Sequence, residues 1–142
     1  MYHKDIMDFS IKLASNINDA NIPVAAVVAI NSSIISYSTN ENDFVWYHAE
    51  LLALKKAQQK LNKKFLVNAS IYVTLEPCIF CSGLLNLVRI KNIYFGAYNN
   101  FNYGLSYCVK YLYYLKQHTN IIGGLCETKC QRLLSAFFKD KR

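Results

Sequence analysis

Two short motifs, thirty residues apart, carry side chains that can bind a metal ion and move a proton. His48-Ala49-Glu50 supplies an imidazole and a carboxylate, and Pro77-Cys78-Ile79-Phe80-Cys81 supplies two thiols. Two thiolates and one imidazole are three of the four ligands of tetrahedral Zn²⁺, and a catalytic site leaves the fourth position to water. A carboxylate that is not itself a ligand can carry the protons of that water. The motifs therefore predict a catalytic zinc site with ligands His48, Cys78 and Cys81 and with Glu50 as the acid–base group.

The first motif is predicted at the beginning of a helix over about 48–62. Four side chains recur there at helical spacing and form one stripe, headed by a carboxylate and otherwise apolar: Glu50, Leu54, Ala57 and Leu61. A buried carboxylate is unfavourable unless it has a partner or a role. His48 precedes the first helical turn, and in an extended conformation its side chain can point to the same side as Glu50. The alternative is a helix-capping Glu50 with a surface His48.

The second motif is predicted to open another helix, with Pro77 at its first position. Cys78 and Cys81 then share one face close to the positive end of the helix dipole, which favours the thiolate form. Two alternatives remain open. The Cys-x-x-Cys pair is also typical of thioredoxin-like redox sites. A closed structural zinc site is the other alternative, and it would take a fourth ligand from this set: His3, His118, Cys108, Cys126 or Cys130.

The remaining pattern predicts helices and strands in alternation after an initial hairpin. We expect an amphipathic helix over about 4–20 and a helix over 105–115, followed by a last helix over about 126–138. Strands are expected at 24–30, 33–38, 71–75, 92–96 and 119–122, with Asn31-Ser32 as the hairpin turn. Helices on both faces of such a sheet predict an α/β fold, a three-layer α-β-α sandwich with a mixed five-stranded sheet. At 142 residues, we expect a single domain over residues 1–142.

Composition and charge limit the environment and the partners. The chain is 53% hydrophobic and 18% charged, which excludes intrinsic disorder. No export signal or membrane span is recognised, and five cysteines without such a signal indicate reduced thiols in a cytoplasmic protein. The net charge is +7, and residues 51–142 hold fourteen basic but three acidic side chains. A polyanionic partner or an ordinary solvated basic face would account for this asymmetry equally well.

Both chemical motifs resemble those of the zinc-dependent cytidine and deoxycytidylate deaminase superfamily. The similarity extends over nearly the whole chain and is greatest to the bacterial tRNA-specific adenosine deaminases. It is carried by Tyr72-Val73-Thr74-Leu75-Glu76-Pro77-Cys78, Arg89-Ile90, Phe95-Gly96-Ala97, Gly123-Gly124-Leu125 and Leu133-Leu134-Ser135-Ala136-Phe137-Phe138. The resemblance implies a cytidine-deaminase-like fold and one Zn²⁺ per subunit, bound by His48, Cys78 and Cys81.

The resemblance further implies hydrolytic deamination of the wobble adenosine in a tRNA anticodon stem-loop, giving inosine. Water activated by zinc would attack C6 of adenine, with Glu50 as the proton carrier. Asn40 matches an asparagine that hydrogen-bonds the flipped base in this family. Family members from bacteria are homodimers in which both subunits contact RNA, so we expect a homodimer here.

The C-terminal segment is the expected RNA-contacting region outside the zinc site. It combines aromatic and basic side chains: Phe137, Phe138, Lys139, Lys141 and Arg142. The alternative is a core-anchoring Phe pair followed by a solvated basic tail. Several positions depart from the tRNA enzymes, including Trp46-Tyr47, Leu87 and Tyr98-Asn99. These departures leave a second function open, the zinc-dependent deamination of a free nucleobase or nucleoside of the guanine or cytosine type.

Overall fold

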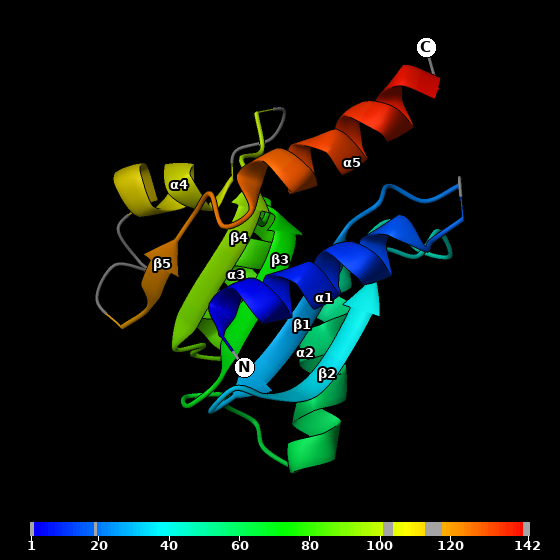
Figure 1. The fold of residues 1–142 in the computed structure, drawn as a ribbon. Helices are drawn as coiled ribbons and strands as arrows, with labels where there is room; N and C mark the ends of the chain where they lie inside the picture. The colour runs from blue at the N-terminus through cyan, green and yellow to red at the C-terminus, as the bar shows by residue number, and fades with distance from the viewer. Residues whose placement is uncertain (1, 19, 101–103, 113–117, 141–142) are drawn as a thin grey trace.

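One mixed β-sheet forms the middle layer of the molecule (Figure 1). The computed structural model describes residues 2–18, 20–100, 104–112 and 118–140. The sheet has the strand order β2-β1-β3-β4-β5, and β1 runs antiparallel to both of its neighbours while β3, β4 and β5 are parallel. The strands are β1 (Ala25–Ile30), β2 (Ser33–Thr39), β3 (Ser70–Leu75), β4 (Asn92–Ala97) and β5 (Asn120–Ile122). This arrangement confirms the predicted five-stranded mixed sheet.

Helices cover both faces of this sheet (Figure 1). On one face lie α1 (His3–Ser15) and α5 (Glu127–Asp140), and on the other lie α2 (Ala49–Leu61) and α3 (Ile79–Leu87). A short helix, α4 (Leu105–Tyr107), continues into a π-helical turn at Cys108–Leu112. The predicted three-layer α-β-α sandwich is therefore confirmed. In the described part of the chain, no helix has both the length and the apolar character of a membrane span.

The central strands are buried on both faces, and their side chains alternate between two hydrophobic clusters. On β1, Ala26 and Val28 face the α2 side, whereas Val27 and Ala29 face the α1 side. The period of two in strand geometry produces this division. Because both faces are apolar, β1 forms a nearly continuous hydrophobic run in the sequence rather than an alternating one.

The hairpin was predicted correctly, and its turn has a clear conformational cause. Asn31 and Ser32 both have positive φ angles, 48° and 66°. Two central residues with positive φ form the type I′ turn, whose twist matches that of the flanking strands. The observed β1 begins one residue later than expected, and β2 extends one residue further.

The predicted extents of two helices were wrong. The first helix ends at Ser15 rather than near residue 20, because the backbone N–H of Asn16 closes the last turn on Leu13 and Asn18 then forms a local turn with Ala20. The expected helix over 105–115 is α-helical only at Leu105–Tyr107 and π-helical to Leu112. Its remaining part, residues 113–117, lies outside the described residues.

The position of Pro77 was also predicted incorrectly. Pro77 lies one residue before the helix cap rather than at the first helical position, because Cys78 is extended (φ −69°, ψ 173°) and caps α3. The Cys78 sulfur accepts a hydrogen bond from the Cys81 backbone N–H at 3.5 Å. Ser82 reinforces this turn through its hydroxyl, which donates to the Cys78 carbonyl at 2.8 Å. The two cysteines nevertheless lie on one side of the helix start, as the metal site requires.

Candidate active site

The three predicted zinc ligands meet at the N-terminal ends of α2 and α3. The Nδ1 atom of His48 lies 3.6 Å from the Cys78 sulfur and 3.4 Å from the Cys81 sulfur. Among the described residues, these three form the one group of His, Cys, Asp or Glu ligand atoms close enough to hold a metal ion. All five cysteines are free thiols. None of the five candidate fourth ligands, His3, His118, Cys108, Cys126 and Cys130, joins the group, which argues against a closed structural site.

The geometry of this set fits a zinc ion. Zinc–sulfur bonds of about 2.3 Å and zinc–nitrogen bonds of about 2.0–2.1 Å, at a tetrahedral angle, place nitrogen and sulfur about 3.5 Å apart. The two observed distances of 3.6 Å and 3.4 Å lie on either side of that value. One nitrogen and two sulfur donors are the ligand types that Zn²⁺ prefers. The residues present therefore fit a three-ligand zinc centre, in which the fourth tetrahedral position is left to water.

The electrostatics of the ligands favour a thiolate at Cys78. A hydrogen bond from Cys81, together with hydrogen bonding to His48, lowers the pKa of Cys78 to about 4. The same bond to Cys78 and the burial of the side chain raise the pKa of Cys81. The pKa of His48 is raised chiefly because its ring is hydrogen-bonded to Cys78. Without a metal, Cys78 is therefore the thiolate of the set, hydrogen-bonded to Cys81 and His48. Binding of a cation would displace the protons of these hydrogen bonds.

Glu50 lies on the first turn of α2, beside these ligands. His48 is the helix cap, with the extended conformation (φ −75°, ψ 153°) that the sequence predicted. Glu50 is only 4% exposed, and burial raises the pKa of its carboxyl group. Leu54 and Ala57 are buried beneath it, as the helical spacing predicted. The carboxyl group is thus held away from water at the position where a proton carrier is expected.

Asn40 has a structural contact that its sequence position did not reveal. It follows the end of β2, and its Oδ1 accepts a hydrogen bond from the Ala49 backbone N–H at 2.8 Å. Because this N–H is at the first position of α2, it has no acceptor within the helix. Asn40 thereby joins the end of β2 to the helix that carries His48 and Glu50.

Glu76 is a second residue whose role was not found in the sequence. It is 3% exposed, and its carboxylate accepts hydrogen bonds from the backbone N–H groups of Asn99 at 3.0 Å and Ser106 at 2.6 Å. A side chain at Gly104 would collide with this carboxylate, because its Cβ would lie 2.8 Å from the Glu76 carboxyl carbon. Gly104 in turn forms an antiparallel bridge with Cys78. A buried carboxylate therefore attaches α4 to the segment that holds the zinc cysteines.

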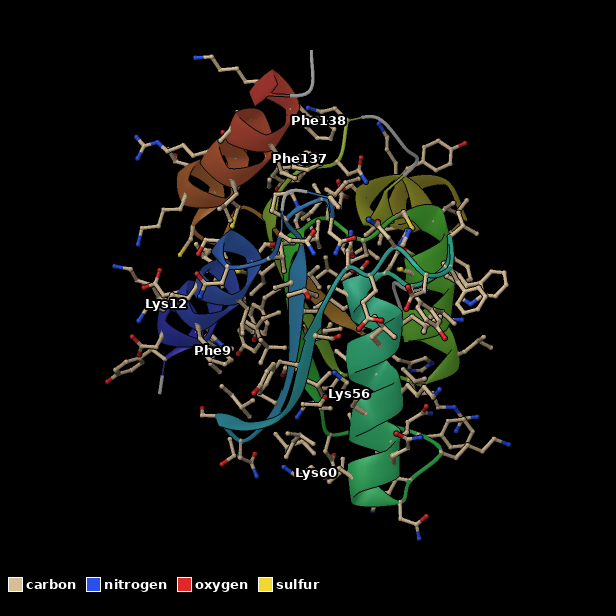
Figure 2. The ribbon with its side chains drawn as sticks, turned by 90° about the vertical axis from the view of Figure 1, so that its right-hand side faces the viewer. Phe9, Lys12, Lys56, Lys60, Phe137 and Phe138 are labelled. Atoms are coloured by element: carbon tan, nitrogen blue, oxygen red, sulfur yellow. The ribbon has the colours of Figure 1, made fainter. Side chains whose placement is uncertain are left out.

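The expected RNA-contacting residues at the end of α5 lie far from the lysines of α2, which include Lys56 and Lys60 (Figure 2). Phe137 is half-buried, whereas Phe138 is exposed, and their rings meet edge to face at 5.2 Å. Lys139 is exposed, and Lys141 and Arg142 lie outside the described residues. Figure 2 shows Phe137 and Phe138 near the end of α5, and Lys56 and Lys60 of α2 toward the opposite end of the molecule. These two groups therefore belong to different surfaces.

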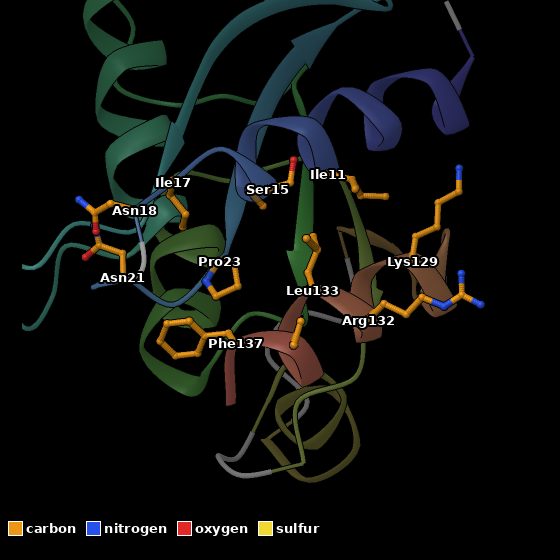
Figure 3. Close-up of a pocket in the computed structure, with 12 residues that line it drawn as sticks. Ile11, Ser15, Ile17, Asn18, Asn21, Pro23, Lys129, Arg132, Leu133 and Phe137 are labelled. Carbon is orange, nitrogen blue, oxygen red and sulfur yellow. The ribbon is translucent and has the colours of Figure 1, made fainter. Parts of the chain in front are cut away.

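A cavity of about 680 Å³ lies between α1 and α5, away from the zinc ligands (Figure 3). Its lining is mixed: Ile11, Pro23, Leu133 and Phe137 are among its apolar residues, and Lys129 and Arg132 of α5 line it as well. None of the zinc ligands lines it. The half-buried position of Phe137 agrees with the alternative in which this ring serves packing.

Comparison with known proteins identifies the family. Residues 1–97 match the cytidine and deoxycytidylate deaminase zinc-binding region. A tRNA-specific adenosine deaminase of Buchnera aphidicola subsp. Baizongia pistaciae is 36% identical over 128 residues, covering 85% of this chain and 78% of the relative. The tRNA-specific adenosine deaminase of Bacillus subtilis is 33% identical over 127 residues, with coverage of 85% and 78%. The chain belongs to the cytidine and deoxycytidylate deaminase family, whose zinc-binding region contains all three ligands.

Solved structures agree with this assignment. A structure from a study of A-to-I editing by tRNA:A34 deaminases superposes with a TM-score of 0.83 at 25% identity, covering 93% of this chain and all of the other. The guanine deaminase of Nitrosomonas europaea superposes with a TM-score of 0.82 at 20% identity, covering 96% of this chain and 84% of that one. At that identity the second likeness concerns the fold, which the two activities share.

Proposed function

We propose that this protein is a zinc-dependent hydrolase that converts the wobble adenosine of a tRNA anticodon to inosine. The observation that carries the proposal is the joint presence of a three-ligand zinc set, a buried Glu50 beside it, and relatives called tRNA-specific adenosine deaminases over 85% of the chain. Zinc at this set would lower the pKa of a bound water toward about 7.

Glu50 is the proton carrier in this proposal. It takes a proton from the attacking water and delivers it to the ring nitrogen N1 of adenine. The water oxygen bonds to C6, the bond between C6 and the amino nitrogen breaks, and ammonia leaves with the second proton of the water. The product carries a carbonyl at C6, which is inosine. A carboxyl group whose pKa is raised by burial is suited to both accepting and returning a proton near neutral pH.

Asn40 contacts the substrate base in this proposal while it supports α2. Its Oδ1 is occupied by the Ala49 N–H, so the amide nitrogen is the group that would donate to a ring nitrogen of the base. The RNA would also contact basic and aromatic side chains at the end of the chain: Phe137, Phe138, Lys139, Lys141 and Arg142. We further propose that the protein is a homodimer and works in the cytoplasm.

The test offers zinc-loaded protein an anticodon stem-loop RNA with a wobble adenosine and scores inosine at that position. Free adenine, guanine and cytosine and their nucleosides are assayed in parallel. Glu50→Gln should reduce the rate by about 10²- to 10⁴-fold with zinc retained. Asp5→Asn, which changes an exposed carboxylate on α1, on the sheet face opposite the zinc ligands, is the control and should leave the rate unchanged. Ammonia released from a free base, with the RNA unchanged, would reject the tRNA assignment in favour of a nucleobase deaminase.

A further inference from the structure

The loop between β2 and α2 exposes aromatic rings beside the zinc site. Phe44 and Trp46 are each 51% exposed, and their rings are stacked at 5.5 Å with an angle of 4° between their planes. This separation lies within the usual range of offset aromatic stacks. Tyr47 packs edge-on against Phe44 at 4.9 Å. Large apolar rings in a loop are half-exposed here rather than directed into either hydrophobic cluster.

This loop is held in place by its own backbone. Tyr47 donates its N–H to the Phe44 carbonyl at 3.0 Å, and its carbonyl accepts from the Glu41 N–H at 3.0 Å. The loop is also joined to a distant part of the chain, because the Asn42 side chain donates to the Ala20 carbonyl at 2.9 Å. The rings are therefore positioned before any ligand arrives, which reduces the ordering entropy that binding must overcome.

The ring pair is also close to the catalytic residues. Trp46 is two residues from His48, so their Cα atoms lie within about 7 Å of one another. The His48 N–H donates to the Trp46 carbonyl at 2.8 Å, which links the two positions directly. On α3, Phe80 is 45% exposed and meets the His48 ring edge to face at 6.2 Å. Aromatic surface thus flanks the metal site on the sides of both α2 and α3.

We propose that Phe44 and Trp46 form a stacking platform for an unpaired nucleobase adjacent to the base being deaminated. This inference rests on the proposed function, because it requires a single-stranded RNA loop as the substrate. Proteins recognise such loops by stacking unstacked bases on aromatic side chains. The carboxylates of Glu41 and Asp43 in the same loop would repel phosphate groups, so the base rather than the backbone of the neighbouring nucleotide faces this surface. A free nucleobase lacks the neighbour and would not engage the platform.

Trp46 provides a direct readout, because it is the only tryptophan in the chain. Glu50→Gln protein loaded with zinc is titrated with an anticodon stem-loop RNA, so that binding is followed without turnover. We expect the Trp46 emission to be quenched by the intact RNA. An RNA with an abasic residue beside the wobble adenosine should bind more weakly and quench much less, and free adenine should not quench.

Four substitutions, made in the same zinc-loaded Glu50→Gln protein, separate stacking from general loop effects. Trp46→Ala and Phe44→Ala should each reduce RNA affinity by about 5- to 150-fold, the range that corresponds to loss of one base–aromatic stack. Trp46→Phe keeps a ring and should retain most of the affinity. Val45→Ala is the matched control, because Val45 lies between the two rings, is 86% exposed and is not aromatic.

The outcomes distinguish this inference from the proposed function. If wild-type protein edits the RNA but Trp46→Ala and Phe44→Ala bind it as tightly as Val45→Ala, the platform is rejected and the function stands. If wild-type protein neither edits nor binds the RNA, both proposals fail together. Trp46 emission that changes with protein concentration but not with RNA would assign the rings to a protein contact instead, which also overturns the platform.

Discussion

The side-chain oxygen of Asn40 lies 2.8 Å from the backbone nitrogen of Ala49 and accepts its hydrogen bond. The contact spans the nine residues that separate the end of β2 from the start of α2. It satisfies an N–H that has no partner within the helix, and it sets where the helix begins. Since His48 and Glu50 flank Ala49, this one contact positions the part of the chain that carries both side chains.

Substitution of Asn40 should separate its two roles. Asn40→Ala removes the acceptor for the Ala49 N–H and should lower the free energy of unfolding by about 1–2 kcal/mol while reducing deamination. Asn40→Asp keeps an oxygen acceptor but removes the amide donor, so stability should be largely retained while activity is lost. Urea unfolding and the inosine assay measure the two effects. An active Asn40→Asp protein would exclude the proposed contact with the substrate base.

Removal of zinc should expose one cysteine to alkylation selectively. The lowered pKa of Cys78, about 4, keeps this residue a thiolate at pH 6, because the pH lies above the pKa. Iodoacetamide should therefore label Cys78 in chelator-treated protein and not in zinc-loaded protein, as measured by peptide mass spectrometry. Cys126 is a matched control of similar partial exposure, since burial raises its pKa and keeps it protonated. Equal labelling of Cys78 with and without zinc would contradict its role as a ligand.

Tyr72 should make stability depend on pH in the alkaline range. Its hydroxyl shares a 2.5 Å hydrogen bond with Nδ1 of His3, and burial with the nearby Tyr94 raises its pKa from 10.0 to about 12. A raised folded-state pKa means that this contribution is complete below pH 10 and is lost as the pH rises toward 12. The loss should be of order 2 kcal/mol.

Comparison with Tyr72→Phe isolates this contribution from those of the other tyrosines. The difference in unfolding free energy between the two proteins is measured at pH 9, 10 and 11. The wild-type value should fall relative to the Tyr72→Phe value as the pH rises above 10, because Tyr72 ionises there in the unfolded chain while the buried hydroxyl keeps its proton. A difference that is constant over this range would show that Tyr72 does not titrate as inferred.

Glu76 should stabilise the segment around the zinc cysteines. Glu76→Ala leaves the N–H groups of Asn99 and Ser106 without their acceptor and should cost about 2–5 kcal/mol of unfolding free energy. Glu76→Gln retains one acceptor oxygen and should cost less. Glu41→Ala, which removes an exposed carboxylate, should change stability by less than about 0.5 kcal/mol. A Glu76→Ala protein as stable as Glu41→Ala would show that these hydrogen bonds are replaced by water.

The zinc ligands were predictable from sequence because the chemistry of a metal site restricts both residue type and spacing. A carboxylate at the head of an apolar helical stripe identified Glu50 as a buried group, and the structure confirms the burial of Glu50, Leu54 and Ala57. Asparagine readily adopts the positive φ that a type I′ turn requires, so the hairpin around Asn31 and Ser32 was also predictable. These features depend on residues close together in the chain, where periodicity and local conformation carry the information.

Local patterns in the sequence were therefore enough to predict the ligand set, the buried acid and the alternation of helices and strands. Tertiary structure alone decided how these parts are supported, because the supporting contacts join residues far apart in the chain. Glu76 holds Ser106 across thirty positions, and no local pattern marks an acceptor for another segment's backbone. The extended conformation of Cys78 likewise depends on its bridge to Gly104 and on the capping of α3. Periodicity locates the elements, but the packing of the whole chain sets their ends and the contacts between them.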